Sequence, residues 1–242
     1  MFASGRSCWV TETSACYHEL AINESGEAGV QTCERRLSAA GRLGMTTTRL
    51  QDFSWERMIA AVDAVRERAR RIATALERAG IKHAVIGGNA IAAWVARVDV
   101  EAVRNTKDVD LLVRREDFDR VIEAAQSVGF VYQNVASVDL FLDGPNGSVR
   151  SAIHIVFARE KVRDDYLLPA PDVTESEEGP EFTVAALDAL VRMKLTSFRL
   201  KDRVHLLDLL DVGLIDESWC DRFPAELGAR LREVIDSSDR ES

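Results

Sequence analysis

Two aspartates separated by a single residue, Asp108 and Asp110, are the side chains of this sequence best suited to metal chemistry. On a strand, both carboxylates would project to one face, about 6–7 Å apart at Cα, because strand side chains alternate between faces. Two anions this close repel each other unless a cation lies between them. A hard divalent ion such as Mg²⁺ relieves that repulsion and can bridge to phosphate oxygens. On its own the pair is a weak indication, since Asp-x-Asp also occurs often on solvated strand edges.

Gly87 and Gly88 stand some twenty residues earlier, between a short apolar run and a helical pattern. Glycines at such a junction allow the backbone to approach a ligand closely, and they direct the first N–H groups of the helix toward an anion. The same pair also fits a tight strand-to-helix turn that binds nothing. Only the combination with the aspartates makes the glycines informative.

The spacing Arg104-x-Thr106-x-Asp108-x-Asp110 follows the glycine pair and its helix. This order resembles the polymerase-β-like nucleotidyltransferase superfamily, whose minimal and AbiEii-type members have the signature Gly-Gly followed by Arg-x-Thr-x-Asp-x-Asp. The combined pattern is much more specific than either motif alone.

The resemblance covers about residues 80–160 and extends into residues 190–195 and Lys201-Asp202, which look like the helical C-terminal part of AbiEii-type proteins. It implies an α/β nucleotidyltransferase fold, a small mixed sheet flanked by helices, with a helical C-terminal extension. It also implies that an acceptor hydroxyl attacks the α-phosphate of an NTP such as ATP and releases pyrophosphate. Such chemistry depends mostly on positioning and charge neutralisation.

The resemblance further implies roles for individual residues. Asp108 and Asp110 would be catalytic and would hold one or two Mg²⁺ ions, with Mn²⁺ as an alternative. The expected nucleotide-binding residues are Gly87, Gly88, Asn89, Arg104, Thr106 and Lys194. Arg104 and Lys194 would neutralise phosphate charge. For Lys194, its place on an apolar helix favours a second interpretation, in which the ammonium group reaches out to water.

His154 stands where the superfamily usually carries a third carboxylate, within Ile153-His154-Ile155. A neutral imidazole suits Mn²⁺ or Zn²⁺ better than Mg²⁺. Three interpretations stay open. His154 is a catalytic base or ligand, given a pKa near 6.5; it marks a catalytically weakened nucleotide-binding relative; or it makes a structural hydrogen bond while the acid lies elsewhere. Asp139, on the preceding strand, is the nearest substitute acid.

Hydrophobic periodicity predicts the elements that position these residues. Helices are expected over about 54–79, 90–97, 116–127, 187–198, 204–212 and 217–237. Strands are expected over about 83–86, 108–114, 137–142 and 149–158, the last two as an antiparallel hairpin around the turn at 144–147. Residues 169–181 predict a surface connection that includes a solvated acidic run at 175–178. His205 and Asp208, three apart on one helical face, predict a surface pair.

Three regions follow from these patterns. Residues 1–50 lack periodicity, and we expect them to be disordered or weakly structured. The alternative is that Met45 is the true start. Residues 51–168 would form the nucleotidyltransferase-like core and residues 169–242 the helical extension. Three of the four cysteines lie within the first 33 residues and fit no zinc pattern, so free thiols are expected.

Composition limits the possible functions. The net charge of -9 argues against a broad basic groove for nucleic acid, although a small nucleotide or an RNA end in a local basic pocket remains compatible. No apolar run approaches the roughly 20 residues that span a bilayer, and no secretory signal is apparent, so no membrane partner and a cytoplasmic location are expected.

The leading hypothesis is a metal-dependent nucleotidyltransferase that moves a nucleoside monophosphate from an NTP to an RNA end, a protein hydroxyl or a small molecule. The AbiEii-like features favour a toxin–antitoxin or defence role with a cognate toxin or antitoxin as partner. The alternative is a catalytically weakened nucleotide-binding or partner-binding relative of this fold. A plain interaction module is the third hypothesis, and it would require every motif to be coincidental.

Overall fold

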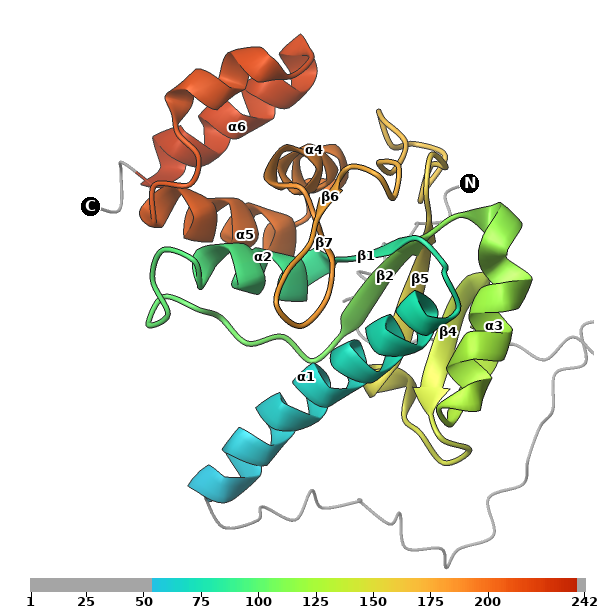
Figure 1. Ribbon diagram of the computed structural model, residues 1–242. Helices are drawn as coiled ribbons and strands as arrows, with labels where there is room; N and C mark the ends of the chain where they lie inside the picture. Colours follow the sequence, from blue (N-terminus) through green and yellow to red (C-terminus); the bar gives the residue numbers. More distant parts are fainter. Residues whose placement is uncertain (1–53, 239–242) are drawn as a thin grey trace, which may run out of the picture. The chain divides into compact units, whose positions relative to one another are not determined.

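Short apolar runs alternate with amphipathic stretches, and they form a mixed sheet flanked by helices in the computed structural model, which describes residues 54–238 (Figure 1). The sheet order is β3-β4-β5-β2-β1-β7-β6. Its strands are β1 (His83–Ile86), β2 (Val109–Val113), β3 (Phe130–Val135), β4 (Val138–Asp143), β5 (Ile153–Phe157), β6 (Ser176–Glu177) and β7 (Val184–Ala185). The predicted α/β class with a small mixed sheet is confirmed.

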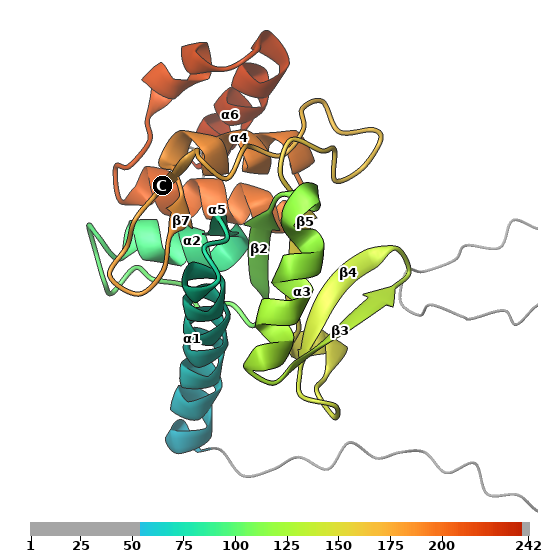
Figure 2. The same cartoon turned by 45° about the vertical axis from the view of Figure 1, so that its right-hand side comes forward.

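The helices occupy two places around this sheet. They are α1 (Trp55–Arg78), α2 (Gly87–Val95), α3 (Phe118–Ser127), α4 (Leu187–Ser197), α5 (Leu200–Asp211) and α6 (Ala225–Ser238), with short 3₁₀ turns η1 (Arg115–Asp117), η2 (Val149–Ser151) and η3 (Glu217–Arg222). α1 and α3 pack together against the sheet, whereas α4, α5 and α6 gather beside α2 (Figures 1 and 2). The helical C-terminal extension is therefore confirmed.

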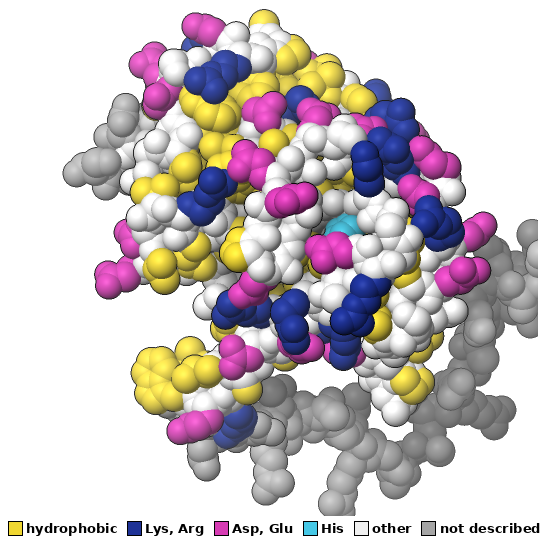
Figure 3. All heavy atoms as spheres, in the orientation of Figure 1, with side chains coloured by type: hydrophobic (Ala, Val, Ile, Leu, Met, Phe, Trp, Pro, Cys, Tyr) yellow, Lys and Arg dark blue, Asp and Glu magenta, His cyan; other side chains and the backbone are white. Residues whose placement is uncertain are grey.

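α1 carries apolar side chains along its length, but they are buried only from about its midpoint onward. Ser54 caps its start, and Ile72 and Leu76 are fully buried in the core. Met58 and Ile59 remain 50% and 59% exposed. Hydrophobic side chains accordingly gather at the protruding end of α1 (Figure 3).

β2 is the strand that positions the chemistry. It pairs in parallel with β5, which places Asp110 opposite His154, and antiparallel with β1, which places Asp110 opposite Ile86. Neighbours on adjacent strands point to the same face of a sheet. The β2–β5 register therefore brings Asp110 and His154 together.

Several predicted boundaries are wrong, each for a local reason. β3 is not predicted because its hairpin turn to β4, Ala136-Ser137, lacks the Asn or Gly typical of positive φ, yet adopts φ of 50° and 65°. α2 begins at Gly87 rather than near Ala90. The last predicted helix is divided into η3 and α6, because Pro224 cannot continue a helix from the preceding residue.

Residues 169–181 are more than a surface connection. Ala170 and Val173 are only 5% and 2% exposed. Glu175, predicted as part of a solvated run, forms an ion pair with Arg192. The segment carries β6 and leads into β7, which pairs in parallel with β1. This pairing ties the C-terminal helices to the sheet that carries the aspartates.

The expectations for residues 1–50, including Met45 and the three early cysteines, lie outside the described residues. Cys220, within the described part, is a buried free thiol. None of the described helices is both long and apolar enough to cross a membrane.

Candidate active site

The two aspartates face one cavity of about 410 Å³. Asp108 directly precedes β2 and its side chain is 35% exposed, while Asp110 lies within the strand and is 25% exposed. Residues that line the same cavity include Gly87, His154 and Lys194. The structure thus brings together five of the residues that the sequence singled out.

Gly87 is required here for two independent reasons. Its φ of +71° lies in the left-handed region that side chains disfavour, and a Cβ at this position would collide with the carboxylate of Asp110. A Cβ on Gly88 would lie 3.1 Å from the side chain of Thr106. The glycine pair is therefore the first turn of α2, packed directly against the aspartate-bearing segment.

Gly87→Ala is expected to weaken both folding and nucleotide binding. Left-handed backbone costs a residue with a Cβ roughly 1–2 kcal/mol, and the new methyl group would also displace Asp110. Gly80→Ala is the matched control, since Gly80 has φ +64° but nothing within 4 Å of its Cβ position. Thermal unfolding should show a loss in both variants, whereas NTP titration should show a loss only in Gly87→Ala. Equal NTP affinity in the two variants would contradict a ligand-facing role for Gly87.

Three other expected nucleotide-binding residues lie away from this cavity. Asn89 donates its side-chain N–H to the carbonyl of Asp108 at 2.7 Å, which fixes the backbone next to the carboxylates. Arg104 pairs with Asp208 at 2.5 Å. With Thr106, Asn89 and Arg104 line a second cavity of about 880 Å³. Asn89 and Thr106 thus contact the backbone of Asp108 and Gly88, respectively, and do not line the cavity of the aspartates.

His154 lies beside the carboxylates, with Nδ1 3.6 Å from Oδ1 of Asp110. The Asp110 carboxylate, which can accept a hydrogen bond from the protonated ring, raises the pKa of His154, although partial burial opposes this. Asp139 is excluded as the substitute acid. Its neighbour Leu140 is the residue opposite His154, so Asp139 points to the other face, where Tyr132 and Asn134 donate to it.

Lys194 does not reach out to water, so that interpretation is wrong. It is 5% exposed, and its ammonium lies 3.1 Å from Asp202, which is completely buried. Burial lowers the pKa of Lys194, while Asp202 acts in the opposite sense. Asp202 also accepts hydrogen bonds from Ser197 and Arg199, and these contacts outweigh its burial and lower its pKa to about 2. The group joins α4 to α5 at the wall of the cavity.

The predicted pair of His205 and Asp208 does not form, because Asp208 is buried and bound to Arg104. Nδ1 of His205 is buried without a partner among the described residues. Burial, and then the nearby Lys194, lower the pKa of His205 to about 4. This ring is therefore neutral near pH 7.

The cavity is also lined by basic and aromatic residues that sequence spacing did not identify. Lys201 lies 3.8 Å from Asp108, and Arg163, Tyr166 and Arg199 also line the cavity. Only Lys201 had a sequence signal, as part of the C-terminal resemblance. On the face shown in Figure 3, Lys and Arg side chains are interspersed with Asp and Glu. That face is therefore mixed in charge.

The donor set fits a divalent ion shared with a substrate. Within residues 54–238, no group of three or more His, Cys, Asp or Glu side chains is arranged to hold a metal by itself. Mg²⁺ usually takes only one or two protein carboxylates and completes its shell with water and phosphate oxygens. Asp108 and Asp110, both open to the cavity, provide that set.

The chain is similar to several known nucleotidyltransferases and nucleotidyltransferase-like proteins, at low sequence identity. No curated protein matches the chain. The solution structure of the antibiotic-resistance factor ANT(2'')-Ia is 14% identical over 74% of this chain and 95% of its own, with a TM-score of 0.44. ANT(2'')-Ia in complex with adenylyl-2''-tobramycin is 16% identical, with coverage of 74% and 91% and a TM-score of 0.37.

An antigenic nucleotidyltransferase-like protein from Paracoccidioides brasiliensis is 15% identical over 72% of this chain and 88% of its own, with a TM-score of 0.47. A family model described as uncharacterised nucleotidyltransferase matches residues 50–168. That range contains the glycine pair, both aspartates and His154. Residues 50–168 of this chain are therefore similar to a family of uncharacterised nucleotidyltransferases.

Proposed function

We propose that this protein transfers a nucleoside monophosphate from an NTP to an acceptor hydroxyl, with Asp108 and Asp110 holding Mg²⁺ or Mn²⁺. One observation carries the proposal: two carboxylates, the first residue of α2 and a buried lysine line a single cavity. Carboxylates alone would repel a triphosphate. Their arrangement beside a helix N-terminus and several cations suits a substrate that is itself anionic.

Each residue then has a physical task. Gly87 lets the N-terminus of α2 approach the triphosphate, where free N–H groups and the helix dipole favour negative charge. Lys201, which is 50% exposed, is available to phosphate oxygens, whereas the ammonium of Lys194 is already bound to Asp202. A bound divalent ion would supply Lewis-acid polarisation of the phosphate. Asn89 holds Asp108 in place by donating a hydrogen bond to the backbone carbonyl of Asp108.

The acceptor is a hydroxyl on an RNA end, a protein side chain or a small molecule. The resemblance to AbiEii-type proteins favours a toxin–antitoxin or defence context, with a cognate protein as partner. His154 would accept the proton of the acceptor hydroxyl. This role is supported by its position opposite Asp110 on the neighbouring strand and by its facing the same cavity.

The test is label transfer by the full-length chain. We would incubate it with α-labelled ATP, GTP, CTP or UTP, with Mg²⁺ or Mn²⁺, and with cellular RNA and protein. Label should appear in an acceptor fraction and disappear when EDTA removes the divalent ions. Absence of both transfer and NTP binding with every nucleotide and metal would refute the proposal.

A second candidate is nucleotide binding without transfer. It is favoured by the imidazole of His154, which stands in the position of an acid and lies close to Asp110. His154→Asp separates the two candidates. If the protein is a weakened relative, the new carboxylate should create or raise transfer; if His154 is the working base, the variant should lower it.

A further inference from the structure

Two kinds of side chain line the cavity at the aspartates. The charged ones include Asp108, Asp110, Lys201 and Arg163. The apolar ones include Leu190 and Met193 of α4 and the loop side chains at 162, 168 and 169, and Tyr166 of the same loop adds an aromatic ring. A nucleoside triphosphate also combines two kinds of surface, a polyanionic chain and a flat, weakly polar base. Ligand pockets commonly combine an apolar lining with a few polar groups in this way.

The loop between β5 and β6 supplies Tyr166 and several of the apolar lining residues, and it is fixed at both ends. The backbone N–H of Arg159 donates to Ala170, and that of Ala170 donates to Glu160, at 3.0 and 2.8 Å. Arg159 forms an ion pair with Asp172 at 3.0 Å. The intervening residues are thus a short closed loop of the Ω type, held by its base rather than by its tip. Such a loop can present a side chain at a defined place.

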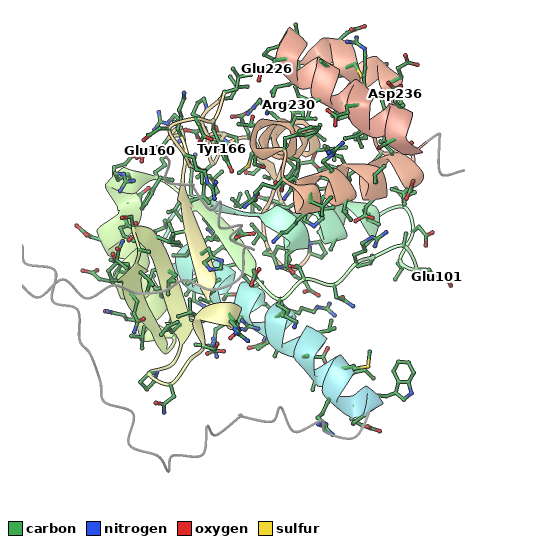
Figure 4. All side chains as sticks on the ribbon, turned by 180° about the vertical axis from the view of Figure 1, so that it is seen from behind. Glu101, Glu160, Tyr166, Glu226, Arg230 and Asp236 are labelled. Carbon is green, nitrogen blue, oxygen red and sulfur yellow. The ribbon has the colours of Figure 1, made fainter. Side chains whose placement is uncertain are left out.

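Tyr166 is that side chain. It is the one aromatic residue lining the cavity within residues 54–238, and it is partly buried. Its backbone N–H donates to Arg163 at 3.1 Å, and the Arg163 guanidinium lies 5.9 Å from the ring centroid. Tyr166 and Glu160 lie on different parts of the loop, with Tyr166 nearer α4 (Figure 4). The ring is therefore part of the cavity wall that this loop contributes.

We infer that Tyr166 is the nucleobase platform of this cavity, stacking on the base of the NTP whose phosphates lie at Asp108, Asp110 and Lys201. This inference rests on the proposed function and adds to it the group that binds the nucleoside. Every base has a π-face, so an aromatic platform binds all four NTPs with little selectivity. Arg163 borders the same ring and supports it through a cation–π contact.

The test compares each NTP with inorganic tripolyphosphate, which has the charged chain but no base. Calorimetric titration of the full-length protein with Mg²⁺ would use the wild type, Tyr166→Ala and Tyr166→Phe. Tyr166→Ala should weaken NTP binding about five- to a hundredfold and leave tripolyphosphate binding unchanged. Tyr166→Phe should bind NTP within about twofold of the wild type. Leu167→Ala is the matched control, since Leu167 is on the same loop, 39% exposed, and does not line the cavity.

The outcomes separate this inference from the function on which it rests. If the wild type binds NTP and Tyr166→Ala binds it equally well, the platform is wrong while the proposed function stands. If Tyr166→Ala loses NTP and tripolyphosphate alike, or Tyr166→Phe loses as much as Tyr166→Ala, stacking is refuted. If the wild type binds neither NTP nor tripolyphosphate, both proposals fail.

Discussion

Asp110→Asn is expected to reduce nucleotidyl transfer at least about a hundredfold while leaving the fold intact. The amide has nearly the shape of the carboxylate, so the close contact with Gly87 is preserved. It removes negative charge that a divalent ion needs, and it leaves Asp108 without its neighbouring carboxylate in the cavity. The measurement is kcat/KM for label transfer, with thermal unfolding to confirm folding.

The matched control is Asp139→Asn on the neighbouring strand. Asp139 points to the opposite face and accepts hydrogen bonds from Tyr132 and Asn134, so its amide variant should keep wild-type transfer within a few-fold. Both variants remove one carboxylate from the same sheet. A difference between them therefore reports the position of the carboxylate and not the change in net charge. Transfer by Asp110→Asn at more than a tenth of the wild-type rate would contradict the metal-binding role.

Much of the fold is readable from the sequence because its signals are local. Each signal depends on neighbours a few residues away. Examples are the helical periodicity of α1, the apolar runs of β1 and β2, and the glycines that end helices, Gly80 and Gly129. β3 escapes prediction because its turn residues adopt positive φ without the usual Gly or Asn. β7 escapes because two residues give no pattern, and its pairing with β1 is a long-range contact.

The site divides in the same way. The Asp-x-Asp spacing and the glycine pair lie close in sequence, and the adjacency of β1 and β2 brings them together. Lys194 and Lys201 reach the cavity only because the chain returns through β7 before α4 and α5 begin. Sequence spacing carries no information about that return. It also cannot show that Arg104 is turned toward Asp208 and away from the carboxylates.

Asp202→Ala is expected to lower the free energy of unfolding by about 3–5 kcal/mol at pH 7, because it leaves the buried ammonium of Lys194 without its carboxylate. Ser197 and Arg199 lose an acceptor at the same time. Urea denaturation measures the loss. The double variant Lys194→Met/Asp202→Leu should recover a large part of it, since an apolar pair of similar size removes the unpaired charge.

The pH dependence gives a second, independent check on the same group, using Asp202→Asn. The pKa of Asp202 is about 2 in the folded protein and near its ordinary 3.8 when unfolded, so its ionised form stabilises the fold. That stabilisation is fully present above about pH 4 and is lost as the pH falls toward 2. The difference in unfolding free energy between wild type and Asp202→Asn should therefore shrink across this window. Asp172 has a similarly lowered pKa, so only the difference between the two proteins isolates Asp202. A gap that stays constant from pH 5 to pH 2 would mean that the Asp202 carboxylate is not what joins α4 to α5.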